Sequence, residues 1–138
     1  MNIRRGQIYL AALDPVLGKE ISKTRPVVVI SNNKNNQFAG TITILPITSK
    51  NLKKRYPFEV HLPKGTANLP KNSKVKADQI RTLDKSRIVK FIGALNEQEI
   101  SRIETAVKIH LDLFLQPHQT SISEKLAEWG SPEDNPST

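Results

Sequence analysis

The feature that most constrains this chain is a series of short, apolar, β-branched segments separated by Pro, Gly, Asn and Lys residues. The segments at residues 8–13, 26–30, 41–48, 58–62, 73–77 and 88–92 have the length and composition of strands. The run at 26–30 is apolar throughout, which predicts a strand buried on both faces. Segment 41–48 alternates until Pro46, and because proline cannot donate to a strand ladder we expect an edge or a bulge near Thr48. This pattern predicts a small barrel or sandwich.

One helix is expected after these strands. Asn96 followed by Glu99 has the form of an N-cap with a capping-box partner. Apolar residues then recur at three- and four-residue steps and form one stripe: Ile100, Ile103, Val107, Leu111 and Phe114. The helix should end before Pro117. We therefore predict a mostly β (α+β) domain, with a small barrel covered at one end or face by a C-terminal amphipathic helix.

The chain of 138 residues has room for one ordinary domain, which we place at residues 1–116. Residues 117–138 hold one base and four acids, so this acidic tail carries −3 of the formal net charge of +8, and the rest carries +11. The composition of the tail predicts a flexible appendage. Within it, residues 121–129 have the spacing of a short helix that docks on the body or on a partner. The charge of the body predicts an anionic partner.

Several functional classes are excluded or disfavoured by what the sequence does not contain. It has no cysteine, and no motif of the HExxH, P-loop or GxGxxG type, so we expect no metal and no cofactor. It has no apolar stretch approaching the roughly 18 residues that span a bilayer, so we expect no membrane association and a cytoplasmic location. His61 is expected to face solvent from a strand, and His110 to lie beside the apolar stripe of the helix.

The loop at residues 14–24 is longer than a hairpin needs and leads directly into Arg25 and the most apolar strand. An arginine held against a rigid strand presents its fixed donors to a phosphate. The alternative is a salt bridge between Arg25 and Glu20, or an arginine that faces solvent at a strand start.

Thr48 and Ser49 end the third segment, beside a loop in which four of six residues are basic, Lys50 and Lys54 among them. Two hydroxyls beside this loop are suited to donating to a phosphate or an oxyanion. Alternatively, they start a turn and the lysines are solvated. Gln79, in a further basic region, either reads a base edge with its amide or caps a local turn.

Five blocks in this order carry a family resemblance: Arg5-Gly6-x-Ile8-Tyr9, Asp14-Pro15-x-x-Gly18-x-Glu20, Thr24-Arg25-Pro26-Val27-Val28-Val29-Ile30-Ser31-Asn32, Ile47-Thr48-Ser49, and Asp78-Gln79-Ile80-Arg81-Thr82-Leu83-Asp84-Lys85. Together they resemble the MazF/PemK (Kid) toxin endoribonucleases of type II toxin–antitoxin systems, over residues 3 to about 115. The chain departs from the family at Gln7 and Asn33, where members often carry Asp, and in its tail.

The resemblance implies an SH3-like barrel that forms a homodimer and cuts single-stranded mRNA at short motifs without a metal. Attack by the ribose 2′-OH would leave a 2′,3′-cyclic phosphate and a 5′-OH. It also implies a cognate antitoxin whose acidic C-terminal segment covers the RNA groove. Arg25 and Thr48 would be catalytic, and Glu20, Ser49, Asp78 and Gln79 would position or read RNA. Two alternatives stay open: a non-catalytic toxin on the same fold that blocks a protein such as DNA gyrase, and a passive RNA-binding module.

Overall fold

The computed structural model describes residues 2–113, so Phe114 and the predicted tail at 117–138 lie outside the described residues. The strands are β1 (Gln7–Ala12), β2 (Thr24–Val29), β3 (Thr41–Thr48), β4 (Glu59–Leu62), β5 (Ser73–Lys76), β6 (Arg81–Asp84) and β7 (Ile88–Ala94). The helices are α1 (Asn33–Phe38) and α2 (Glu97–Leu111), with short 3-10 turns η1 (Thr66–Asn68), η2 (Ala77–Gln79) and η3 (Lys85–Arg87). All six predicted strands are confirmed, with ends shifted by at most two residues. The sequence patterns missed β6 and α1.

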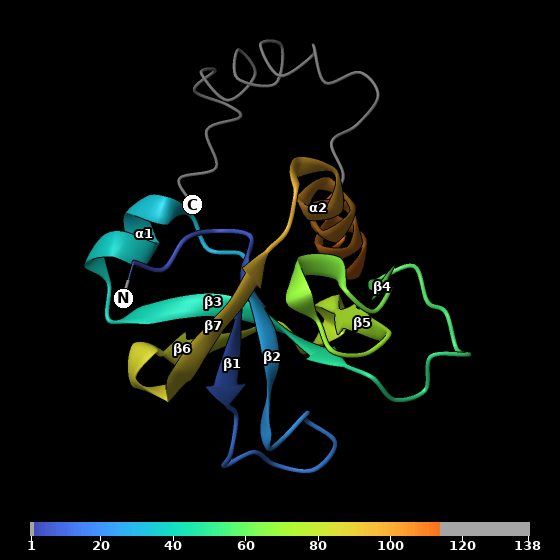
Figure 1. Cartoon of the computed structure of the whole chain (residues 1–138), viewed down its shortest axis with the longest axis horizontal. Helices are drawn as coiled ribbons and strands as arrows, with labels where there is room; N and C mark the ends of the chain where they lie inside the picture. The colour runs from blue at the N-terminus through green and yellow to red at the C-terminus, as the bar shows by residue number, and fades with distance from the viewer. Residues whose placement is uncertain (1, 114–138) are drawn as a thin grey trace, which may run out of the picture.

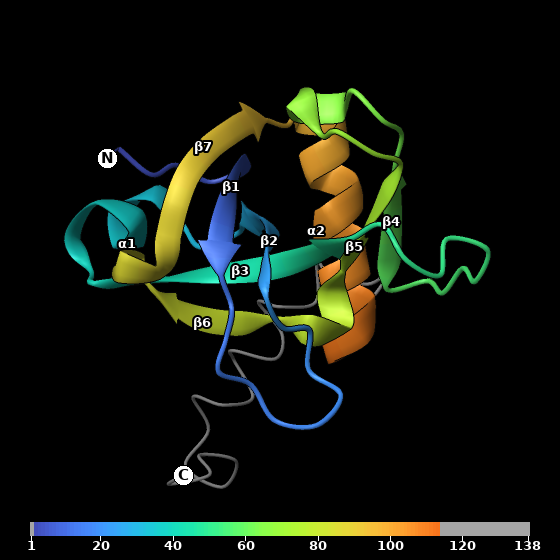
Figure 2. The ribbon, with the colours of Figure 1, turned by 60° about the horizontal axis from the view of Figure 1, so that its bottom comes forward.

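The strands form one antiparallel sheet in the order β4-β5-β3-β2-β1-β7, and β6 pairs with β3 off this path. Figure 1 shows β3 running across the whole molecule behind β1 and β2. Figure 2 shows α2 beside β4 and β5, while α1 lies at the opposite end of β3. The loop between β1 and β2 projects from the bottom of both views. The mostly β architecture with a C-terminal helix is therefore as predicted.

An edge or a bulge was predicted near Thr48. β3 is an interior strand up to Pro46, where its pairs with β2 end, and Ile47 and Thr48 pair with β5 alone. The Ile30 N–H donates to Thr43 O at 2.9 Å, in the register that sets Val27 opposite Pro46. Because hydrogen-bonded and non-hydrogen-bonded pairs alternate along an antiparallel ladder, the nitrogen of Pro46 faces away from β2. On that side β6 pairs with β3 up to Ile44 and β5 begins at Ile47, so the missing donor falls where β3 changes partner.

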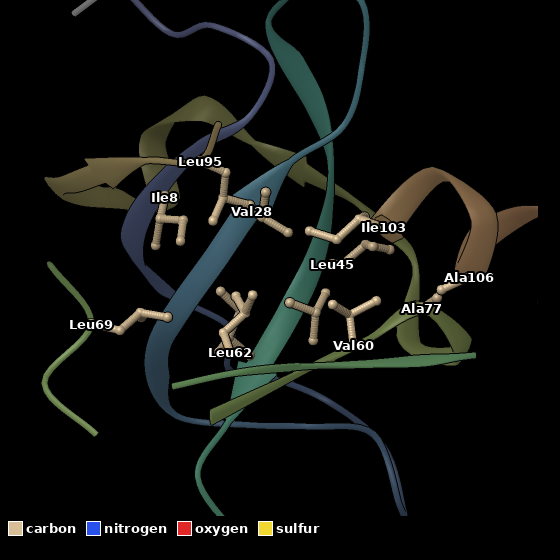
Figure 3. Packing of buried hydrophobic residues seen from close by; sticks show 12 residues of the cluster. Ile8, Val28, Leu45, Val60, Leu62, Leu69, Ala77, Leu95, Ile103 and Ala106 are labelled. Carbon is tan, nitrogen blue, oxygen red and sulfur yellow. The ribbon is translucent and has the colours of Figure 1, made fainter. Parts of the chain in front are cut away.

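The two faces of the sheet bury two separate apolar clusters. One contains alternate residues of the strands, among them Ile8, Val28 and Leu45, together with Ile103 and Ala106 of α2 (Figure 3). The other lies on the opposite face and contains Tyr9, Ala11, Val27, Val29, Ile42 and Ile44. Val27, Val28 and Val29 are at most 1% exposed, which confirms the prediction of a strand buried on both faces.

Helix α2 begins at the predicted cap and ends at Leu111. The Asn96 side chain accepts from the Glu99 N–H at 2.8 Å, and the Glu99 carboxylate accepts from the Asn96 N–H at 2.9 Å. Asp112 closes the helix in the left-handed conformation. Leu111 is 42% exposed, so the apolar stripe continues beyond the core that it helps to cover. Within residues 2–113, no helix has the length and hydropathy needed to cross a membrane.

Candidate nucleic-acid interface

The register of the sheet places four polar side chains in one row across four strands. Lys74 of β5 pairs with Thr48 of β3 on one side and with His61 of β4 on the other. The β2–β3 pairs end at Val27 and Pro46, and the same register extended by two residues would set Arg25 opposite Thr48. Because directly opposed residues project to the same face, Arg25, Thr48, Lys74 and His61 follow one another across the sheet. The row continues the face that carries Val27 and Ile44.

Arg25 is held by the end of the loop before it. Its Nε donates to Ser22 O at 2.7 Å, and the side chain is half-buried. The expected alternative, an ion pair with Glu20, is absent from the part of the chain that the structure describes. Glu20 is exposed and accepts from the Leu17 N–H at 3.2 Å instead. Because Nε is already bonded, the two terminal nitrogens of Arg25 remain to meet an anion.

Thr48 is oriented by the loop after it. Its hydroxyl oxygen accepts from the Lys50 N–H at 3.1 Å, and the residue is 8% exposed. A threonine oxygen that accepts a backbone hydrogen bond keeps its own proton free for donation. A phosphate oxygen in front of the row would therefore meet an arginine fork on one strand and a hydroxyl donor on the next.

A hollow of about 280 Å³ lies in front of this pair. Five of the predicted site residues line it: Glu20, Arg25, Thr48, Lys50 and Gln79. A smaller, neighbouring hollow of about 180 Å³ is also lined by Arg25 and Thr48, together with Ser49, Lys71 and Ser73. Gln79 makes a local contact, since its Oε1 accepts from the Ile21 N–H at 3.4 Å and so ties η2 to the β1–β2 loop. The structure thus brings most of the predicted residues to one place.

The remaining predicted residues lie at the margin. Lys54 lies with Ser49 along the β3–β4 loop, in a separate shallow hollow. Asp78 does not line the hollow in front of the pair and reaches it only through Lys76, whose Nζ lies 3.9 Å from the Asp78 carboxylate. Within residues 2–113, no three His, Asp or Glu side chains are grouped as metal ligands would be.

A buried ion pair beside the hollow was missed by the sequence patterns. Lys74 is 2% exposed, and its Nζ donates to Glu59 Oε1 at 3.1 Å, to Asn51 O at 2.9 Å and to Lys54 O at 3.4 Å. Lys76 lies 3.3 Å from the other carboxylate oxygen. Burial favours a raised pKa for Glu59, but the hydrogen bonds and charges of Lys74 and Lys76 outweigh it and lower that pKa. All three donors of Lys74 are used, so it anchors the β3–β4 loop from below.

The sequence did contain a signal for this pair. Glu59 and His61 alternate with Val60 and Leu62, and two lysines alternate with Val75, so each segment has one apolar and one charged face. Two such strands of opposite charge are natural neighbours, and they pair in the structure.

The prediction for His61 was wrong. The residue is half-buried, and its Nε2 is enclosed with no hydrogen-bond partner among the described residues. Burial, followed by the charges of Arg55 and Lys74, lowers the pKa of His61, while the charge of Glu59 and the backbone of Lys54 oppose the shift. The strand alternates as predicted, but Leu52 and Arg55 of the β3–β4 loop lie beside His61 at this edge strand. His110 is exposed, with its ring tilted against Phe58 at 5.8 Å.

Comparison with known families decides the assignment. The model of a family described as PemK-like, MazF-like toxin of type II toxin-antitoxin system matches residues 4–111. The chain belongs to this family. Among the relatives of this MazF-like chain, the endoribonuclease MazF9 of Mycobacterium tuberculosis is 40% identical over 117 residues, which cover 81% of this chain and 98% of that protein. The family resemblance found in the sequence is confirmed, and the chain is a homologue of a MazF endoribonuclease.

Solved structures agree with this assignment. A crystal structure of MazF from Deinococcus radiodurans superposes with a TM-score of 0.71 at 26% identity, and the match covers 82% of this chain and 99% of that one. A MazE–MazF crystal structure from the same organism superposes with a TM-score of 0.65 at 27% identity, and covers 83% and 99% of the two chains. The antiparallel sheet with its C-terminal helix is the MazF fold.

Proposed function

We propose that this chain is a toxin that cuts single-stranded mRNA, and that the bond is broken in front of Arg25 and Thr48. The observation that carries this proposal is that Arg25 of β2 and Thr48 of the neighbouring strand β3 together line two hollows. A basic body of net charge +11 suits a polyanionic substrate. Membership of the PemK-like, MazF-like family supports the same function.

The proposed reaction is an attack by the ribose 2′-oxygen on the adjacent phosphorus. The 2′-oxygen loses its proton to water, the bond from phosphorus to the 5′-oxygen breaks, and that oxygen takes up a proton from water. The products are a 2′,3′-cyclic phosphate and a 5′-OH. Arg25 stabilises the negative charge that develops on the phosphorane, because its two terminal nitrogens are free to donate. Arginine stays protonated in proteins, so it acts as an electrostatic stabiliser and hydrogen-bond donor and not as a base. Thr48 donates its hydroxyl proton to a non-bridging oxygen.

The other predicted residues would hold the strand on either side of the bond. Lys50 lines the hollow and supplies charge, and Glu20 and Gln79 line it with acceptors for base edges. Ser49 and Lys54 extend the basic surface along the β3–β4 loop. Asp78 acts from the margin through its ion pair with Lys76.

Cleavage of a long RNA in EDTA tests the proposal. The parent chain should give discrete fragments that end in cyclic phosphate. Arg25→Ala should lose nearly all activity, and Arg25→Lys most of it, since a lysine keeps the charge without the planar fork. Lys34→Ala is the matched control, because Lys34 is an exposed base on α1 that lines none of the hollows around the pair. Intact RNA, or full activity of Arg25→Ala, would contradict the proposal; intact RNA with capture of DNA gyrase would favour a protein-blocking toxin.

We further propose that the curved sheet is an SH3-like barrel, that residues 1–116 are the folding unit with 117–138 as an appendage, and that the chain acts as a homodimer in the cytoplasm, where mRNA is available. A cognate antitoxin with an acidic C-terminal segment would cover the basic hollows. The MazE–MazF structure of Deinococcus radiodurans supports such a pairing. Light scattering tests the dimer, and co-expression with the antitoxin tests the neutralisation.

A further inference from the structure

A second, larger hollow of about 520 Å³ lies at the outer edge of the sheet, beyond β4. It is lined by residues of the β3–β4 loop, of β4 and β5 with their flanking turns, and of α2: Leu52, Arg55, His61, Leu62, Pro63, Asn72, Ser73 and Arg102. Two of these side chains are arginines, and none of them is acidic. The hollow therefore carries positive charge, and the proposed cleavage chemistry does not use it.

One group in this hollow lacks the partner that its burial requires. The Nε2 of His61 is enclosed and makes no hydrogen bond to any described residue. A buried polar atom without a partner costs free energy unless a ligand or water supplies one. Arg102 donates to His61 O at 3.1 Å and lines the same hollow as the His61 side chain, and its remaining donors make no other hydrogen bond among the described residues. An occupant that accepts hydrogen bonds would satisfy both side chains.

The electrostatics of the hollow point the same way. After burial, the charges of Arg55 and Lys74 are the main causes that lower the pKa of His61. Glu59 is the acid that opposes them, and its carboxylate is already paired with Lys74 and Lys76. An anion placed among Arg55, Arg102 and His61 would meet positive charge from the β3–β4 loop and α2, and a hydrogen-bonding imidazole from β4.

The second hollow shares one lining residue with the hollows at the proposed cleavage site. Ser73 lines both the second hollow and the hollow of about 180 Å³ that Arg25 and Thr48 also line. Across the sheet, His61 lies two strands from Thr48, with Lys74 between them. Two strand spacings amount to roughly 10 Å. Single-stranded nucleic acid sites extend over several nucleotides, so both hollows fit along one bound strand.

We propose that the second hollow binds a backbone phosphate of a nucleotide flanking the cleaved bond, held by Arg55, Arg102 and the Nε2 of His61. This inference rests on the proposed function, since it names a second subsite for the same RNA. The phosphate gives His61 the partner that it lacks, and its negative charge raises the pKa of His61 on binding. Long substrates then bind better than minimal ones.

The test uses a short mixed-sequence RNA with 2′-O-methyl riboses, which has no free 2′-OH and is not cut. Arg102→Gln should bind it about tenfold more weakly than the parent, and the log–log salt slope should become shallower by about 0.7. Arg4→Gln is the matched control, because Arg4 is an exposed arginine that lines none of these hollows. Arg102 is itself exposed, so its variant should keep the parent's unfolding midpoint.

A spectroscopic readout separates this subsite from general charge attraction. In a proton NMR titration of the ring protons, the pKa of His61 should rise when the RNA is added to the parent and to Arg4→Gln, and should rise much less in Arg102→Gln. Equal binding by Arg102→Gln and Arg4→Gln, or a His61 pKa that does not respond to RNA, would overturn the inference even if the parent cuts RNA. The His61 response without any cleavage of unmodified RNA would instead overturn the proposed function and leave the subsite standing.

Discussion

Replacing Lys74 with Met should cost about 3–5 kcal/mol of folding free energy, the range found when one partner of a buried ion pair is removed. The side chains of Lys74 and Glu59 are 3% and 0% exposed, so water cannot take the place of the ammonium. Its loss leaves Glu59 with Lys76 alone, and it leaves the carbonyls of Asn51 and Lys54 without their donor. Urea unfolding followed by circular dichroism measures the loss as a lower midpoint at an unchanged slope.

Two further variants separate the ion pair from the loop that it anchors. Lys76→Met is the control, because Lys76 meets the same carboxylate but is 22% exposed, and it should cost at most about 1 kcal/mol. The double variant Lys74→Met with Glu59→Leu should recover much of the stability, because it buries no unpaired charge. It should not recover RNA cleavage, since Asn51 and Lys54 still lack their anchor beneath the loop. A double variant as unstable as Lys74→Met, or one with parental activity, would refute this reasoning.

Three other perturbations have defined outcomes. Lys74 and Lys76 hold the pKa of Glu59 below its ordinary value of 4.5, so the ionised carboxylate stabilises the folded state above that pH, and this stabilisation is lost as the pH falls below it. In an acid titration, the free energy of unfolding of Glu59→Gln should therefore fall less steeply than that of the parent. Gly93→Ala should destabilise strongly, by about 1–3 kcal/mol or more in thermal unfolding, because its Cβ would clash with the backbone oxygen of Ala67, whereas Gly40→Ala should be nearly neutral. Asn96→Ala should lower the free energy of unfolding by about 1 kcal/mol, measured as a lower unfolding midpoint, because it removes the capping box of α2. An unchanged midpoint would contradict this.

The strands were predictable from the sequence because each carries its own local pattern. Periodicity and turn residues placed six of the seven, and the cap placed the start of α2. β6 was missed because Arg81–Asp84 contains one buried apolar residue, Leu83, and owes its conformation to pairing with β3. α1 was missed because its stability comes from contacts outside the helix: Asn36 is buried, and its amide donates to Ser31 O.

The site was only partly predictable, because its parts come from distant segments. Arg25 and Thr48 each stand out beside an apolar strand, but nothing local states that they face each other. Lys74 and Glu59 lie 15 residues apart, and their pairing depends on the β4–β5 register. For His61, the alternation was visible in the sequence, but the loop that lies beside it could not be seen there. The sequence therefore does not show how the elements pack against one another. The pairing of buried charges depends most strongly on this packing.

The register that aligns the proposed catalytic pair is fixed by the core and not by the pair itself. Val28 and Leu45 face one apolar cluster while Val27 and Ile44 face the other, so both sides of the β2–β3 ladder are committed. A slip of one residue would turn all the side chains of one strand to the opposite face, and the burial of its apolar residues in both clusters would be lost. Because Arg25 continues this ladder at its polar end, its position opposite Thr48 is held by the burial of valines and isoleucines several residues away. Substitutions at the pair itself should thus change cleavage and leave folding nearly intact.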